Sequence, residues 1–232
     1  MLRELFYSEN LLPLALAVER FLQEGYSFHD RANINELALK TIVLKVLRDE
    51  SPSSSAFDIK SENVVSSADK RKRADIVIFR RGGTGFTVIE LKVVRPINCA
   101  PSDSLFPDAA CAVVAAKRKA QVRTDLVKGV DARALVVEIP ARRSRGASGG
   151  DMRPAPQTAA EFLHNALDQG VRYAQTIMGS RSLEQMPPWG NVFALAVVSE
   201  QTLWCQAWVP GSPSEYGTMT SHVLQQLSDC VA

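Results

Sequence analysis

Two short apolar runs joined by a glycine-rich turn constrain the fold of this chain more than any other feature. The stretch RADIVIFRRGGTGFTVIELK covers residues 73–92, and near-continuous apolar runs of this length are typical of strands buried on both faces. The glycines between the runs suit a tight hairpin turn. We therefore predict paired strands at 74–79 and 86–91, inside a sheet that is covered on both sides.

Helical and strand patterns continue on either side of this hairpin. Before it, we expect amphipathic helices at 11–25 and at about 34–49, the second capped by Asn33 or Asn35. Leu37, Val43 and Leu44 would lie on the apolar face of that second helix, together with Leu47. A serine-rich break at 51–55 and a short strand at 63–67 precede the hairpin.

The second half of the chain predicts further elements. A loop at 96–108 leads to a helix at 109–128 and a buried strand at 133–139. Residues 140–157 are rich in Pro, Gly, Ser and Arg and predict a flexible surface loop. Thr158 followed by Glu161 is a capping-box signature for a long helix. A hairpin of strands at 192–199 and 203–209 and a final helix at 221–231 complete the expectation of a single α/β domain over 1–232, with a mixed central sheet flanked by helices.

Composition and cysteine spacing exclude several classes of protein. Of 232 residues, 46% are hydrophobic, which is enough to fill a sizeable core. The 27 Lys and Arg nearly balance the 25 Asp and Glu, so the chain is not a nucleic-acid coat protein. The four cysteines are far apart and form no C-x-x-C pair, which argues against zinc and for free thiols in a reducing compartment. The longest early apolar run, 11–18, is too short to span a membrane, so we expect an intracellular protein, cytoplasmic or nuclear.

Charged residues on the two predicted strands point to a chemical site. Asp75 begins the first strand, where burial without a partner would be costly. On the second strand the period of two places Val88, Glu90 and Lys92 on one face. Paired carboxylates are ligands for hard cations such as Mg²⁺, and a lysine beside them can orient a water molecule and neutralise developing charge. The alternative is a hairpin with ordinary surface charges.

Three further residues bear on that choice. Glu36 on the upstream helix is a third acidic group that could face a metal. Gln169 and Tyr173 lie four apart on the later helix and hence on one face, where an amide and a phenol could contact a phosphate or orient Lys92.

These residues together resemble the PD-(D/E)xK nuclease superfamily, which has the restriction-endonuclease-like fold. The likeness is carried by Asp75, by Glu90-Leu91-Lys92 as the E-x-K element, by Glu36, and by Gln169-Gly-Val-Arg-Tyr173 as the Q-x-x-x-Y element of RecB-like nucleases. The chain is particularly similar to nuclease domains beside AAA-ATPase-like modules and in Crinkler-type effectors. Its departures are Lys72 and Arg73, where many relatives have glycine, and the long segment 96–157.

The resemblance implies roles for each matched residue. Asp75, Glu90 and the Leu91 backbone carbonyl would hold Mg²⁺ or Mn²⁺, with Glu36 as a further ligand, and Lys92 would serve the attacking water. Gln169 and Tyr173 complete the catalytic set. The implied activity is metal-dependent hydrolysis of phosphodiester bonds in DNA, with RNA as another possible substrate and an ATPase as a possible partner or fused module.

Two other classes of function stay open at this stage. One is a nuclease-like module without activity that binds nucleic acid or a protein partner, as part of an effector or toxin. The other is a purely structural interaction domain, in which the face of Gln169 and Tyr173 would pack in the core. The basic run at 70–73 resembles a nuclear-localisation cluster, and it is equally compatible with a solvated or DNA-facing edge.

Overall fold

Three helices and two sheets make up the part of the chain that the computed structural model describes. The described residues are 11–27, 30–31, 33–49, 56–67, 70–82, 85–95, 98–101, 130–132, 135–137, 157–179, 189–198, 201–210 and 221–226. The helices are α2 (Leu12–Gly25), α4 (Glu36–Asp49) and α7 (Ala159–Gly179). The main sheet contains β1 (Phe57–Ser67), β2 (Lys70–Arg80), β3 (Phe86–Val94), β7 (Trp189–Val198), β8 (Gln201–Pro210) and β9 (Ser221–Gln226). A small second sheet contains β4 (Cys99–Pro101), β5 (Leu135–Val137) and β6 (Gln157–Thr158).

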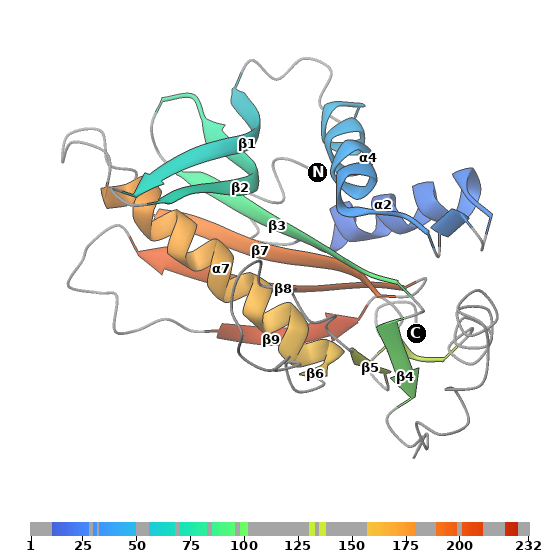
Figure 1. Ribbon diagram of the computed structural model, residues 1–232. Helices are drawn as coiled ribbons and strands as arrows, with labels where there is room; N and C mark the ends of the chain where they lie inside the picture. The colour runs from blue at the N-terminus through green and yellow to red at the C-terminus, as the bar shows by residue number, and fades with distance from the viewer. Residues whose placement is uncertain are drawn as a thin grey trace.

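The main sheet is mixed, with strand order β1-β2-β3-β7-β8-β9 (Figure 1). β1, β2 and β3 are successive antiparallel neighbours, and β7 then lies parallel to β3. A parallel neighbour requires a crossover connection, and α7 lies in that connection. β7, β8 and β9 continue as antiparallel neighbours. The predicted mixed α/β architecture is therefore confirmed.

Helices on the two faces of the sheet enclose two separate cores. α7 covers one face, and α2 and α4 cover the other (Figure 1). Successive residues of β3 point to opposite faces, so Val88 lies in the α7 core while Ile89 and Leu91 lie in the core under α2 and α4. Glu90 follows the same alternation and points toward α7.

The hairpin turn between β2 and β3 has the chemistry that its glycines predict. Gly82 has a φ of 100°, a left-handed conformation that costs glycine little and other residues more. The Arg80 amide donates to the Gly85 carbonyl at 3.2 Å, which closes the loop. The two strands are longer than predicted, because β2 begins at Lys70 and β3 continues to Val94.

A capping box begins α7 at the predicted position. The Glu161 amide donates to the Thr158 Oγ1 at 3.2 Å, and the Glu161 carboxylate accepts from the Thr158 amide at 2.8 Å. Both bonds satisfy amide donors that the first turn of a helix would leave unpaired. The predicted cap of α4 is also confirmed, since the Asn35 Oδ1 accepts from the Ala38 amide at 2.8 Å.

Thr158→Ala should lower the free energy of unfolding by about 1 kcal/mol, because it removes the capping oxygen of α7. Thr176→Ala is a matched control on the same helix, where the hydroxyl donates only to the Arg172 carbonyl four residues back. That bond adds little to helix stability, so the control should unfold like the wild type. Urea denaturation of the three proteins makes the comparison. Equal losses in both variants would contradict a capping role.

Several expected elements differ from the structure. The predicted C-terminal helix at 221–231 is wrong over 221–226, which forms β9 against the otherwise open edge of β8. A helix of about eleven residues is marginal on its own, so pairing with that edge decides the conformation. Leu37 is 65% exposed rather than part of the apolar face of α4. The core residues of that helix are Leu39, Ile42, Val43, Val46 and Leu47.

Four predictions along the middle of the chain are refined or lie outside the described residues. Of the strand predicted at 133–139, the described residues 135–137 form β5, with Leu135 and Val137 buried, in the small sheet rather than the main one. The predicted loop at 96–108 includes β4, and residue 157 of the predicted loop at 140–157 belongs to β6. The rest of that loop and the helix predicted at 109–128 lie outside the described residues.

The described helices were also compared with the length of a membrane span. None of the three is both long and apolar enough to cross a bilayer.

Candidate active site

The predicted site lies where β2 and β3 separate. β2 pairs with β3 only from Ile76 to Phe79, whereas its pairing with β1 continues to Lys70. Asp75 and Glu90 are the next residues beyond the last cross-strand pair, Ile76 with Ile89. The sequence pattern placed Asp75 at the start of a strand, whereas in the structure it lies inside the longer β2. Because β2 and β3 separate at this point, the Asp75 side chain lies close to Glu90.

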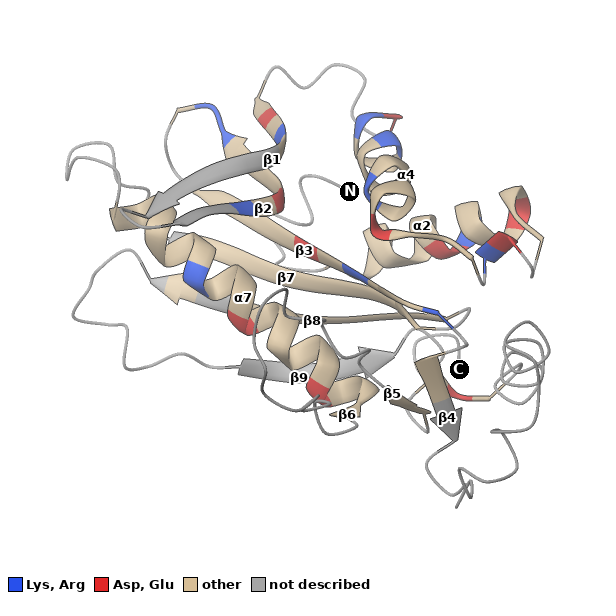
Figure 2. Ribbon diagram, viewed as in Figure 1, with Lys and Arg blue, Asp and Glu red and all other residues tan. Residues whose placement is uncertain are grey.

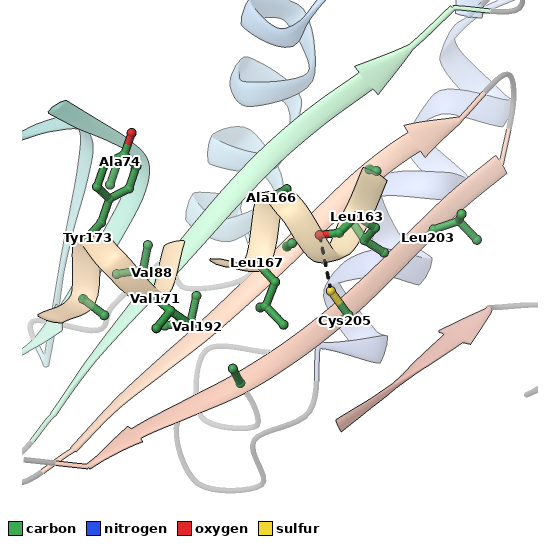
Figure 3. Close-up of a cluster of buried hydrophobic side chains, with 14 of the residues drawn as sticks. Ala74, Val88, Leu163, Ala166, Leu167, Val171, Tyr173, Val192, Leu203 and Cys205 are labelled. Atoms are coloured by element: carbon green, nitrogen blue, oxygen red, sulfur yellow. Dashed lines mark hydrogen bonds between the residues drawn. The ribbon is translucent and has the colours of Figure 1, made fainter. Parts of the chain in front are cut away.

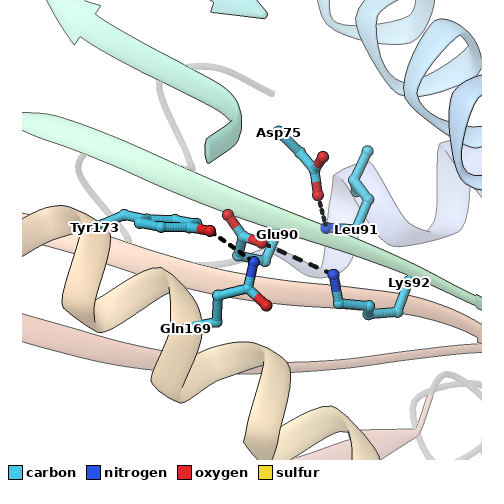
Figure 4. Close-up of polar contacts among 6 residues, drawn as sticks. All are labelled: Asp75, Glu90, Leu91, Lys92, Gln169 and Tyr173. Carbon is cyan, nitrogen blue, oxygen red and sulfur yellow. Dashed lines mark hydrogen bonds and ion pairs between the residues drawn. The ribbon is translucent and has the colours of Figure 1, made fainter. Parts of the chain in front are cut away.

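The Asp75 side chain replaces a strand partner at this point. Its Oδ2 accepts a hydrogen bond from the Leu91 amide at 3.0 Å (Figure 4). The amide and carbonyl of one strand residue point to the same neighbouring strand, so the Leu91 carbonyl also points toward the Asp75 side of β3. One carboxylate and one backbone carbonyl consequently face the gap between the two strands.

Glu90 is the most deeply buried charged residue of the site. Its side chain is 0% exposed, and neither carboxylate oxygen has a hydrogen bond of normal geometry among the described residues. A buried carboxylate without partners costs several kcal/mol when it is ionised. Such a group in a folded protein calls for an explanation, and an oxygen-seeking cation is one that fits the chemistry of the donor.

Burial raises the pKa of Glu90 to about 8. Removal from water is the largest cause, and the negative charge of Asp75 adds to it. The positive charge of Lys92 and the backbone amide of Asp75 act in the opposite direction, while the charge of Glu36 makes the smallest, raising, contribution. At neutral pH, without a cation, Glu90 is therefore largely protonated.

Lys92 lies two residues further along β3, on the same face as Glu90. Its Nζ is 4.0 Å from the Glu90 Oε2, and its side chain is 20% exposed (Figure 4). This distance is at the outer limit of an ion pair, so Lys92 offsets only part of the burial of Glu90. The ammonium group is close to both the buried carboxylate and solvent, which suits contact with a charged substrate.

Gln169 and Tyr173 of α7 lie opposite Glu90 and form a hydrogen-bonded pair. The Gln169 Nε2 donates to the Tyr173 hydroxyl at 2.9 Å, and Figure 4 shows this hydroxyl directed toward Glu90. Burial raises the pKa of Tyr173; the bond from Gln169 lowers it, and the charges of Glu90 and Asp75 raise it. The hydroxyl thus keeps its proton at neutral pH and can donate it. Its ring packs in the core beside Ala74 (Figure 3).

Glu36 is not part of a compact acidic group in the structure. It is exposed at the start of α4, and its charge acts on Glu90 only as the weakest of five contributions. Among the described residues, no group of three or more His, Cys, Asp or Glu side chains is placed to hold a metal ion together. Asp75, Glu90 and Lys92 do converge, so the oxygen donors present are two carboxylates and the Leu91 carbonyl. A ligand role for Glu36 stays a prediction.

Gly170 is a site residue that the sequence motifs did not single out. A Cβ atom at this position would lie 2.6 Å from the Val192 Cγ1 and 3.1 Å from the Glu90 Cγ. α7 can therefore approach the sheet over Glu90 only because residue 170 has no side chain. The signal available in the sequence was a glycine inside a helix, where it costs about 0.5–1 kcal/mol relative to alanine and so calls for a packing reason.

We compared the chain with models of protein families, with curated proteins and with solved structures. The chain matches no family, no curated protein and no solved structure.

Proposed function

We propose that the protein is a metal-dependent nuclease of restriction-endonuclease-like fold that hydrolyses phosphodiester bonds in DNA. The observation that carries the proposal is the buried Glu90 carboxylate beside Asp75, whose oxygens accept no hydrogen bond of normal geometry among the described residues and whose nearest cation, Lys92, is 4.0 Å away. The order of elements supports it, because a helix, an antiparallel hairpin ending in E-x-K and a crossover helix resemble the arrangement of the PD-(D/E)xK superfamily.

The donor set fits a hard divalent cation. Asp75, Glu90 and the Leu91 carbonyl would hold Mg²⁺ or Mn²⁺, since such ions take oxygen ligands from one or two carboxylates and complete their shell with water and phosphate. When bound, the ion supplies a Lewis acid at the phosphoryl oxygen and a water of lowered pKa. The buried Glu90 carboxylate would gain from such an ion the positive countercharge that no neighbouring group fully supplies.

The protein side chains supply orientation and charge. The bond from the Leu91 amide fixes the Asp75 carboxylate in place. The Lys92 ammonium stabilises the negative charge that grows on the phosphate during attack by water, and it holds that water in line. The Tyr173 hydroxyl, itself oriented by Gln169, donates to a phosphate oxygen. Burial of Glu90 under α7 excludes bulk water, which strengthens each of these interactions.

Cleavage of labelled linear and circular DNA tests the proposal. Wild-type protein should cut with Mg²⁺ or Mn²⁺ and should not cut with EDTA. Lys92→Met should lower the rate by about 10²- to 10⁴-fold, as expected for loss of a group that assists proton transfer or charge stabilisation. Lys45→Met, on the exposed surface of α4, is the control and should cut like the wild type.

The outcomes separate the nuclease from its rival. Degradation of circular DNA would identify an endonuclease, whereas cutting of linear DNA alone would identify an exonuclease. If the wild type binds DNA and does not cut it with either metal, the chain is a nuclease-like binding module. Equal cutting by Lys92→Met and the wild type would remove Lys92 from the mechanism.

A further inference from the structure

α7 carries one basic side chain, and it lies inside the segment that joins Gln169 to Tyr173. Arg172 is the only Lys or Arg among the 21 residues of the helix, whose acidic residues are Glu161 and Asp168. Figure 2 shows it as the single blue segment of α7. The Arg172 side chain is exposed, so it is accessible to a ligand in solution.

Helical spacing places Arg172 at the rim of the site. Residues three apart on a helix are neighbours on its surface, so Arg172 lies beside Gln169. Exposure rises from the buried Gly170 through the half-buried Gln169 to Arg172. Long side chains on a helix point back over the residues three and four positions earlier, which directs the guanidinium toward Gln169 or Asp168. Burial raises the pKa of Tyr173, and the charge of Arg172 acts against this shift, so the guanidinium is within electrostatic reach of the phenol.

The Arg172 guanidinium does not use the acidic partner that the helix offers. Asp168 lies four residues earlier, which is a spacing at which helical ion pairs form. Lys45 and Asp49 on α4 have the same spacing and do form a pair. Among the residues that the structure describes, Arg172 has neither an ion pair nor a side-chain hydrogen bond. Its guanidinium can therefore bind an external anion without first breaking an internal contact.

The position of Arg172 and the chemistry of arginine favour a phosphate as that anion. A guanidinium is always charged, and its planar set of donors matches two oxygens of a phosphate. In the proposed nuclease the scissile phosphate lies at Asp75, Glu90 and Lys92. Arg172 is farther around α7 from Glu90 than Gln169 is, so an anion at Arg172 would be a second phosphate. A nucleotide chain supplies such a neighbour beside the bond that is cut, whereas an isolated phosphodiester does not.

We propose that Arg172 binds a phosphate that flanks the scissile one, and that the protein thereby selects nucleotide chains over isolated phosphodiesters. Arg172 is a specificity residue and takes no part in the hydrolysis itself. The inference rests on the proposed function, because it defines which substrates the same site accepts. The contact between Arg172 and a nucleotide chain can nevertheless be measured without any cleavage.

Cleavage of two substrates tests this selectivity. One substrate is a fluorescent DNA oligonucleotide, in which phosphates flank the bond that is cut. The other is bis(p-nitrophenyl) phosphate, which contains a single phosphodiester and no second phosphate. The full-length proteins are the wild type, Arg172→Gln, Arg172→Lys and the control Arg20→Gln, which removes one charge from an exposed position of α2. Binding of the same oligonucleotide in EDTA, at several salt concentrations, is the second measurement.

Arg172→Gln should change the preference between the two substrates. The ratio of kcat/KM for the oligonucleotide to kcat/KM for the single diester should fall by about tenfold or more, as expected for loss of a charged hydrogen bond. Most of the change should be in KM, because a phosphate that does not react is held equally in the ground state and the transition state. Arg172→Lys should recover part of the ratio, since it keeps the charge but not the planar set of donors. Arg20→Gln should have the wild-type ratio.

Binding in EDTA gives a result that does not depend on cleavage. Arg172→Gln should bind the oligonucleotide about tenfold more weakly than Arg20→Gln, and its slope of log affinity against log salt should be smaller by about 0.7 to 0.9, the value of one phosphate contact. Equal losses of activity on both substrates, or equal binding by Arg172→Gln and Arg20→Gln, would overturn the proposal. Weaker binding by Arg172→Gln, with neither substrate cut by the wild type, would uphold the phosphate contact and reject the nuclease.

Discussion

Glu90→Gln should abolish metal-dependent cleavage and at the same time stabilise the fold at alkaline pH. The amide keeps the shape of the side chain but cannot supply a negative ligand. Loss of several kcal/mol of Lewis-acid stabilisation corresponds to at least about 10³-fold in rate. The same DNA cleavage assay measures it. Glu24→Gln, at an exposed position of α2, is the control and should retain full activity.

The effect of Glu90→Gln on stability follows from the pKa of about 8 in the folded protein. The carboxyl group has an ordinary pKa near 4.5 when unfolded, so between pH 4.5 and 8 the folded protein holds a proton that the unfolded chain has released. The free energy of unfolding of the wild type therefore falls as pH rises through this window, and it levels off above pH 8. In the Glu90→Gln variant position 90 does not titrate, so its free energy of unfolding does not fall for this reason.

Chemical denaturation at pH 5, 7 and 9 measures this difference. The variant should match the wild type near pH 5 and exceed its free energy of unfolding by a few kcal/mol at pH 9. Mg²⁺ should stabilise the wild type at pH 9, because it favours the ionised carboxylate, and should leave the variant unchanged. A wild type whose stability is the same at pH 5 and pH 9 would show that Glu90 is ionised without cost.

Local sequence patterns were sufficient to predict that Asp75, Glu90, Lys92, Gln169 and Tyr173 lie together, because these residues have fixed spacings on two adjacent strands and one helix. Glu90 and Lys92 share a face by the period of two, and Gln169 and Tyr173 share one by helical spacing, so their contacts of 4.0 Å and 2.9 Å follow from local geometry. The position of Asp75 required only that the glycine-rich turn form a hairpin. These are short-range relationships.

The features that the sequence did not reveal depend on contacts between distant segments. β9 is a strand because β8 offers an open edge, and no pattern within 221–231 contains that information. The burial of Glu90 depends on how closely α7 approaches β3. The extension of β2 to Lys70 depends on β1, whose pairing allows a run of four basic residues to adopt a conformation that its own composition does not favour.

Gly170→Ala should destabilise the fold by about 1–3 kcal/mol and reduce cleavage, although alanine is the better helix former. Helix propensity alone would favour the substitution by about 0.5–1 kcal/mol. The new methyl group would lie 2.6 Å from the Val192 Cγ1 and 3.1 Å from the Glu90 Cγ, and overpacking of this kind typically costs more than the gain in propensity. α7 must move outward or Glu90 must shift, and either change alters the position of Tyr173 relative to Asp75 and Glu90.

Gly179→Ala isolates that steric effect. It makes the same substitution at the end of the same helix, where a Cβ atom would have nothing within 4 Å. This control should keep wild-type stability within about 0.5 kcal/mol and wild-type cleavage. Urea denaturation and the DNA assay should therefore separate the two variants in both measurements. A Gly170→Ala protein as stable and active as Gly179→Ala would mean that α7 does not pack closely over Glu90. The burial of the Glu90 carboxylate could then not be explained by the approach of α7 to β3.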